Sequence, residues 1–486
     1  MNKTDALPLY HTLLRHAQKG ALRFHVPGHK GGLFFSPQGL DTYRSILAID
    51  LTELEGLDYL HGPQGVIKEA QELAALQFGA DRTYFLVNGS TVGNLAMILG
   101  CVQEGDLVLV QRNSHQSVYH GLSLARAQLV PLTPELDCRF DVATHIHPDH
   151  FHQMLKRYPQ AKACLLTYPT YYGWAKPEHL KTIIELAHQH GVLVLVDEAH
   201  GAHFGQHPSL PPSALQLGAD LVVQSTHKML GSLTMTAMLH LRLGRVPVAN
   251  VEKYLAMLQS SSPSYPLMAS LDLARHQLSQ MSAEKWQEAV DATDRLRQRL
   301  RLLKEHYLIS GDQKLQEDPF KLVIRPRFGW SGFQLQQALR QKGIEIELAD
   351  PEQICLTLPL NLNAKWIDKL VQALERIAFA QGGNRTTQGK RGSFGSLPHG
   401  GVPAEPIGLQ VYREEETERV YLEESVGRRA AQLVTPYPPG IPLIIPGETI
   451  TPSHVQAILY YQRAGAYFPD IPSDSLTLAV LTKSDG

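Results

Sequence analysis

Two short apolar runs that stop at polar residues constrain this fold more than any other feature of the chain. The run GVLVLVDEAH, residues 191–200, has five consecutive apolar residues, rich in valine, and stops at Asp197. Such runs are typical of strands buried on both faces of a parallel sheet. A second run, ADLVVQ at 219–224, is followed by STHKMLGS at 225–232, which contains Lys228. The sequence therefore predicts an acid and a lysine beyond two strands, at the edge where open α/β sheets bind ligands.

An acid and a lysine at neighbouring strand ends are what pyridoxal phosphate (PLP) chemistry needs. Lys228 would hold the aldehyde as a Schiff base, and Asp197 would keep the pyridine nitrogen protonated, so that the ring can accept electrons from a bond that breaks at the substrate Cα. Ser225 and His227 could hold the phosphate. Each residue alone also has an ordinary interpretation, because most lysines after strands are solvated and a strand-end aspartate often caps the next helix.

Four segments resemble the bacterial ornithine/lysine/arginine decarboxylases of the aspartate-aminotransferase fold type. They are DEAHGAHFG at 197–205, STHKML at 225–230, DLTELEGLDYLHGPQGVIKEAQELAALQFGA at 50–80 and YPPGIPLIIPGE at 437–448. The resemblance implies a PLP fold type I large domain with a mainly parallel sheet, and smaller C-terminal α/β domains. It covers nearly the whole chain apart from a linker.

The stretch RTYFLVNGSTVGNLAMILG at 82–100 predicts a strand, a turn of small residues and a helix that begins near Ser90 and Thr91. Free backbone N–H groups and the helix dipole would bind a phosphate there. The same groups also serve an ordinary capped helix, so the two interpretations are not exclusive. The resemblance implies that the cofactor phosphate binds at this place.

The resemblance assigns roles to further residues. It implies that His115, beyond the predicted strand LVLVQ at 107–111, stacks on one face of the pyridine ring and that the methyl group of Ala199 covers the other. His200 could reach the substrate carboxylate or the Schiff base, and is the second catalytic candidate beside Lys228. The segment SSSPSYP at 260–266, which includes Ser262, would reach the cofactor phosphate of a second subunit. A domain-edge loop with helix-capping serines is the alternative.

The domain organisation follows from strands that alternate with helices through residue 240 and from later changes in composition. We expect an N-terminal arm at 1–49, a PLP-binding large domain at 50–268, a long helix and small α/β domain at 269–380, a flexible linker at 381–401 and a C-terminal domain at 402–486. The long helix is expected from Met268 to about Glu305. Another helix is expected from Glu423 to Ala431.

Composition excludes several classes of function. A formal net charge of −2 gives no reason to expect a nucleic acid or membrane partner. The four cysteines lie far apart without paired spacing, so we expect neither a metal site nor disulfides. No signal peptide or transmembrane span is recognisable, which favours a cytoplasmic protein.

The residues and the resemblance together predict PLP-dependent α-decarboxylation of a basic amino acid, with arginine to agmatine first and lysine to cadaverine or ornithine to putrescine next. The acids Glu53, Glu55 and Asp58 could pair with a guanidinium group near the site entrance, or could form a solvated helix face.

Two other functions stay open. An aminotransferase of the same fold would need an arginine for the substrate α-carboxylate, and Arg325 and Arg327 are the candidates. A catalytically inactive relative that binds a partner is disfavoured by the presence of Lys228 and Asp197. The long enzymes of the family carry an N-terminal wing domain that builds decamers. Because this chain starts where the short form begins, we expect a smaller assembly, a homodimer or dimer-based homo-oligomer with shared active sites.

Overall fold

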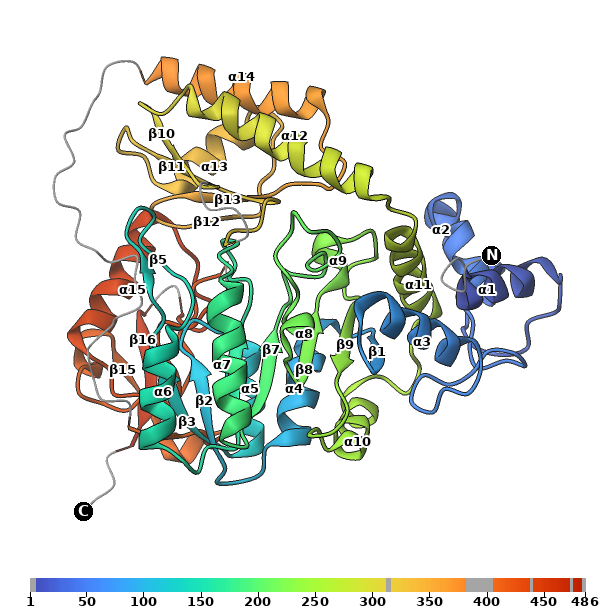
Figure 1. Ribbon diagram of the computed structural model, residues 1–486, viewed down its shortest axis with the longest axis horizontal. Coiled ribbons are helices and arrows are strands. Elements are labelled where there is room, and N and C mark those ends of the chain that lie inside the picture. Colours follow the sequence, from blue (N-terminus) through green and yellow to red (C-terminus); the bar gives the residue numbers. More distant parts are fainter. Residues whose placement is uncertain (1–5, 312–315, 382–404, 438–439, 473–474, 483–486) are drawn as a thin grey trace. The chain divides into compact units, whose positions relative to one another are not determined.

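The computed structural model describes residues 6–311, 316–381, 405–437, 440–472 and 475–482 (Figure 1). The chain divides into two compact units. Unit 1 comprises the described residues of Met1–Cys101, Leu193–Pro208 and Pro212–Ser282. Unit 2 comprises those of Val102–Val192, Ser209–Pro211 and Ala283–Gly486. Each unit therefore combines segments from separate parts of the chain.

Unit 1 is built on four strands in the hydrogen-bonded order β1-β9-β8-β7. The strands are β1 (Arg82–Leu86), β7 (Leu193–Asp197), β8 (Leu221–Gln224) and β9 (Ala237–Leu241). β7 and β8 are parallel, whereas β9 is antiparallel to both β8 and β1. The helices are α1 (Pro8–Gln18), α2 (Pro37–Ile49), α3 (Val66–Phe78), α4 (Gly89–Cys101), α8 (Ala214–Leu217), α9 (Thr226–Met229), α10 (Val248–Leu258) and α11 (Tyr265–Ser279), with a 3₁₀ turn η2 (Lys30–Gly32).

Helix α4 lies unusually close to the strands of unit 1 because residue 93 is glycine. A Cβ atom on Gly93 would lie 2.4 Å from Cγ2 of Val223 and 2.8 Å from Cδ1 of Leu86. Both distances are well inside van der Waals contact, so no larger residue fits without a shift of the helix.

Unit 2 contains four further strands in the order β6-β2-β3-β14. β2 (Leu107–Gln111) is parallel to both β3 (Gln128–Leu132) and β6 (Ala163–Thr167), and β14 (Ile407–Gly408) is antiparallel to β3. The remaining elements of this part are the helices α5 (Gln116–Ala125), α6 (Pro148–Arg157) and α7 (Pro177–Gln189) and the short hairpin of β4 (Leu136–Asp137) and β5 (Val142–Ala143). Helices α6 and α7 lie side by side.

Unit 2 also contains a small α/β part formed by residues 283–380. Its antiparallel sheet has the order β10-β11-β13-β12, and α12 and α14 lie together beside it (Figure 1). The elements are α12 (Ala283–Arg301), β10 (Tyr307–Ile309), β11 (Lys321–Pro326), α13 (Gly332–Arg340), β12 (Leu348–Ala349), β13 (Ile354–Thr357) and α14 (Ala364–Ala380). The linker expected at 381–401 lies, apart from Gln381, outside the described residues.

The prediction of one long helix from Met268 to about Glu305 is wrong, because the chain forms two helices there, α11 and α12. The hydroxyl of Ser279 donates a hydrogen bond to the carbonyl of His276 at 2.8 Å, and α11 ends at that serine. Serine side chains compete with the backbone for such bonds and so favour helix ends. The two helices also belong to different units.

The helix expected from Glu423 to Ala431 is also wrong. Only Glu423–Ser425 forms a 3₁₀ turn, η4, and Gly427 then adopts a φ of 81° that a helix cannot continue. The chain becomes extended, and Ala430 bridges to Val480. The surrounding elements are η3 (Glu414–Glu416), β15 (Thr417–Tyr421), α15 (Pro452–Ala464) and β16 (Thr477–Leu481). Within the described residues, no helix combines the length and apolar character needed to cross a bilayer.

We predict that Gly93→Ala lowers the free energy of unfolding by about 1–3 kcal/mol, because the added methyl group overpacks the contact of α4 with Val223. Urea unfolding followed by circular dichroism measures this loss. Gly62→Ala is the matched control, since a Cβ there meets nothing within 4 Å, and it should change stability by no more than about 0.5 kcal/mol. Equal stability of the two variants would contradict the role given to Gly93.

Candidate active site at the ends of β7 and β8

The apolar runs within 191–200 and 219–224 form the neighbouring parallel strands β7 and β8. Their register places Asp197, the last residue of β7, opposite Val223 of β8. Strand β8 ends one residue later, and Ser225 then leads into the short helix α9, which carries Lys228. Because parallel strands end at the same edge of a sheet, the predicted acid and lysine follow adjacent carboxyl ends.

Asp197 is 4% exposed, and both of its carboxylate oxygens accept hydrogen bonds. Oδ2 accepts from Nδ2 of Asn94 at 2.9 Å, and Oδ1 accepts from the backbone N–H of Ala199 at 3.1 Å. Asn94 is buried in the middle of α4 and was not among the candidate residues. The sequence does contain a signal for Asn94, because it is a polar residue in a helix whose other buried residues are mostly apolar.

Lys228 contacts the buried imidazole of His200. Its Nζ lies 3.1 Å from Nε2 of His200, so the contact joins the loop after β7 to helix α9. A neutral imidazole nitrogen can accept a hydrogen bond from an ammonium group, and the pair can hold or transfer a proton at Nζ.

Two hydroxyl groups meet at the beginning of α4. Oγ of Ser225 donates a hydrogen bond to Oγ of Ser90 at 2.8 Å. Ser90 is the second residue of α4, and Thr91 is exposed next to it. The first backbone N–H groups of a helix have no partner within the helix, so hydroxyls and N–H groups together make this end suited to an anion.

Three other candidate residues have different surroundings. Nδ1 of His227 lies 2.8 Å from the carbonyl oxygen of Thr236, which holds that ring to the backbone. Ser262 is exposed, and its N–H donates to Oγ of Ser260 at 3.1 Å. His115 belongs to unit 2, where it caps α5. The phosphate role of His227, the ring stacking of His115 and the second-subunit contact of Ser262 stay predictions, as does the ring contact of the buried Ala199.

A chain of buried polar side chains crosses the four strands of unit 1. Glu198 accepts hydrogen bonds from the backbone N–H of Ala214 at 2.7 Å and from Nε2 of Gln224 at 2.6 Å. Nε2 of His240 lies 3.1 Å from Oε1 of Gln224, and Nδ1 of His240 lies 2.8 Å from Oγ1 of Thr83. With Gln224 in this orientation, Nε2 of His240 carries the hydrogen and Nδ1 accepts one from the threonine.

Burial shifts the pKa values of the two ionisable groups in this chain toward their neutral forms. It raises the pKa of Glu198 to about 8 and lowers the pKa of His240 to about 3. Near pH 7 the strands beside the candidate site are therefore joined by mostly uncharged groups, which avoids the cost of a buried charge.

We predict that Glu198 makes stability depend on pH. Its pKa is higher in the folded chain than its ordinary value of 4.5, so its contribution is fully present below that value and is lost as pH rises through about 8. Thermal midpoints measured from about pH 5 to about pH 9 should therefore fall more steeply for the wild type than for Glu198→Gln.

Glu69→Gln, a change at an exposed glutamate of unit 1, is the control and should keep the wild-type slope. Parallel pH profiles for all three proteins would show that Glu198 does not titrate in this window.

Comparison with known proteins identifies the family of the chain. Residues 7–315 match the major domain, and residues 404–474 the C-terminal domain, of Orn/Lys/Arg decarboxylases. The chain is 43% identical over 460 residues to the uncharacterized protein YaaO of Bacillus subtilis, covering 93% of each chain. It is 36% identical over 469 residues to the arginine decarboxylase of Bacillus subtilis, covering 94% of each.

Solved structures confirm the predicted fold. The lysine decarboxylase LdcF of Francisella novicida superposes with a TM-score of 0.81 at 19% identity, covering 99% of this chain and 82% of that one. An alanine–glyoxylate aminotransferase from Nostoc sp. superposes with a TM-score of 0.53 at 16% identity, covering 66% of this chain and 89% of that one. The α/β fold is the aspartate-aminotransferase-like PLP fold type I. With the two matched domains and the 36% identical relative, the chain belongs to the Orn/Lys/Arg decarboxylase family.

Proposed function

We propose that this chain is a PLP-dependent α-decarboxylase of a basic amino acid, with arginine as the first candidate substrate. The observation that carries the proposal is the placement of Asp197 and Lys228 after the adjacent parallel strands β7 and β8, in a chain of the Orn/Lys/Arg decarboxylase family. The 36% identical relative named arginine decarboxylase supports the choice of substrate.

The polar groups at this edge of unit 1 fit PLP by their chemistry. Lys228 offers the amine that would bind the aldehyde, and Asp197 a buried carboxylate for the pyridine nitrogen. The Ser90 and Ser225 hydroxyls, with the first N–H groups of α4, would hold the phosphate. When bound, PLP supplies an electron sink for the bond that breaks at the substrate Cα.

The side chains around this site would hold its groups in place and handle protons. Asn94 and the N–H of Ala199 orient the Asp197 carboxylate, which leaves it little freedom to rotate. His200, at 3.1 Å from Nζ, is placed to hold a proton at the Lys228 amine or to receive one from it. Rigid placement of such groups accounts for much of the rate in reactions of this kind.

The candidate residues for binding the substrate's distal group are the acids expected near the site entrance. Of the three acids expected near the entrance, Asp58 caps α3 instead, because its carboxylate accepts hydrogen bonds from the N–H groups of Gly65 and Ile67, each at 2.8 Å. Glu53 and Glu55 are exposed and stay candidates for the guanidinium group. The shared site in a homodimer also stays a prediction, in which the exposed Ser262 would contact the neighbouring subunit.

The aminotransferase alternative is weaker. It requires an arginine that binds the substrate carboxylate, and Arg325 is already paired with Glu352. Arg327, the other candidate, is exposed.

We predict that protein reconstituted with PLP absorbs visible light and that borohydride attaches the cofactor to the peptide containing Lys228. Lys228→Ala should lose the attachment and reduce turnover by several orders of magnitude, because the variant lacks the amine that would bind the aldehyde beside His200. Peptide mapping by mass spectrometry locates the label. Labelling of Lys30 or another lysine would refute the assignment.

For the substrate, we predict that kcat/KM for arginine exceeds that for lysine and ornithine, and that the products are carbon dioxide and agmatine. Chromatography of the reaction mixture separates agmatine, cadaverine and putrescine. A 2-oxo acid without carbon dioxide would show an aminotransferase, and a higher kcat/KM for lysine would reverse the order of substrates. Both outcomes are read from the reaction products and not from the position of the label, so they test the reaction and the substrate separately from the role of Lys228.

A further inference from the structure

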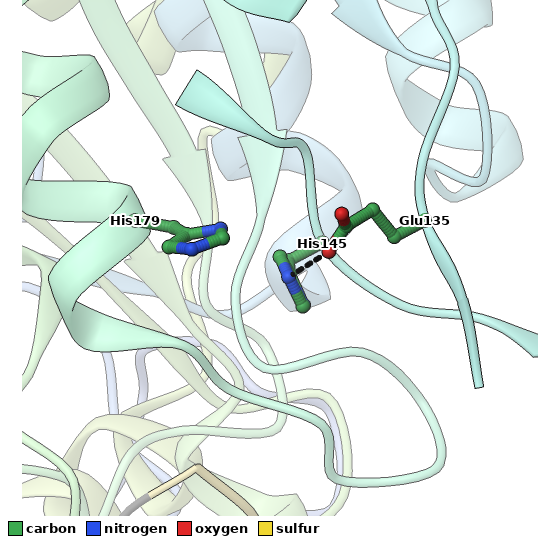
Figure 2. Close-up of side chains that lie close together, drawn as sticks. All are labelled: Glu135, His145 and His179. Carbon is green, nitrogen blue, oxygen red and sulfur yellow. Dashed lines mark ion pairs between the residues drawn. The ribbon is translucent and has the colours of Figure 1, made fainter. Parts of the chain in front are cut away.

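Three side chains in unit 2, outside the candidate active site, could together bind a metal ion. They are Glu135, His145 and His179 (Figure 2). One possible ligand atom from each side chain lies within 4.8 Å of the other two. Figure 2 shows Glu135 and His145 directed toward one another, with the ring of His179 beside them. None of the three belongs to the constellation around Lys228.

The backbone brings these side chains together from two elements. Glu135 directly precedes β4 and His145 follows β5, and the hairpin places them opposite each other: the N–H of Glu135 donates to the carbonyl of His145 at 2.8 Å. His179 lies in the first turn of α7, and its ring packs edge-on against that of His145 with centroids 4.7 Å apart. The group therefore joins the hairpin to a helix.

One ring nitrogen of each histidine in this group lacks a hydrogen-bond partner among the described residues. Nδ1 of His145 and Nδ1 of His179 are buried without a hydrogen bond. Nε2 of His145 lies 2.6 Å from Oε2 of Glu135, so that nitrogen already has the carboxylate as its contact. A buried polar atom without a partner is costly, and a metal ion that accepts nitrogen lone pairs would remove that cost.

An imidazole binds a metal ion through the lone pair of a ring nitrogen in its neutral form. Both histidines carry a buried Nδ1 without a hydrogen bond, so neither ring would have to give up a hydrogen bond at that atom to bind an ion.

The ligand types select the class of metal. Two imidazoles and one carboxylate match Zn²⁺ and its transition-metal neighbours, whereas Mg²⁺ and Ca²⁺ prefer oxygen ligands alone. Around tetrahedral Zn²⁺ the ligand atoms are about 3.3 Å apart, so side chains already within 4.8 Å need only small rotations. The carboxylate side chain of Glu135 is 44% exposed, which leaves room for water in the fourth position.

We propose that Glu135, His145 and His179 bind one divalent transition-metal ion, Zn²⁺ first, and that the ion ties the β4–β5 hairpin to α7. The ion would replace the contact between Glu135 and His145 and would engage an otherwise unpartnered nitrogen of His179.

Isothermal titration of the full-length chain with Zn²⁺, after chelator treatment and in phosphate-free buffer, tests the proposal. We expect one ion per chain, and at least about tenfold weaker binding in His145→Gln, His179→Gln and Glu135→Gln. His190→Gln is the matched control, because it removes an exposed imidazole from the other end of α7. It should bind Zn²⁺ as the wild type does.

Thermal unfolding provides a second readout that does not depend on turnover. Zn²⁺ should raise the midpoint of the wild type and of His190→Gln but not of the three ligand variants. Absence of Zn²⁺ binding in the wild type, or wild-type affinity in all three ligand variants, would overturn the proposal. Loss of binding in His190→Gln or in Cys138→Ser, with the three ligand variants unaffected, would place the ion elsewhere. If a histidine variant does not fold, Glu135→Gln still decides the question, because that side chain is partly exposed.

Discussion

The parallel pairing of β7 with β8 is the constraint on which the candidate active site depends. Both strands are buried almost throughout, so polar side chains are excluded until the strands end. The register that sets Asp197 opposite Val223 makes them end together. The first polar groups after each strand therefore appear at one edge of unit 1, and Glu198 and Gln224 join there through a buried hydrogen bond. A shift of register by one residue would turn these side chains to the other face.

The close approach of α4 to these strands is the second requirement. Gly93 lets the helix lie against Val223, and the next residue, Asn94, can then donate its hydrogen bond to Asp197. The same helix begins at the hydroxyl pair of Ser90 and Ser225. One element thus orients the acid through its middle and carries the Ser90 hydroxyl in its first turn. The close approach of α4 at Gly93 therefore affects the geometry of both.

The two groups of polar side chains illustrate different uses of burial. The chain from Glu198 to Thr83 is linked by hydrogen bonds from strand to strand, and burial favours its uncharged forms, so it joins four strands without an unpaired charge. The group of Glu135, His145 and His179 is also partly buried, but Nδ1 of each histidine lacks a hydrogen-bond partner among the described residues. A satisfied network stabilises a fold by itself, whereas an unsatisfied one requires a ligand or costs stability.

The sequence alone determined the elements whose signals are local. The buried strands, the acid and lysine at their ends, and the turn of small residues that begins α4 could all be predicted from short runs of residues. Two predictions from patterns over longer stretches were wrong. The helix expected over 268–305 is interrupted after Ser279, and the helix expected over 423–431 cannot continue through Gly427. Only the tertiary structure decided that Asn94 binds Asp197, that Asp58 caps α3 and that Glu135, His145 and His179 converge. These contacts join residues that periodicity cannot relate, because side chains distant along the chain meet only after strands and helices have packed.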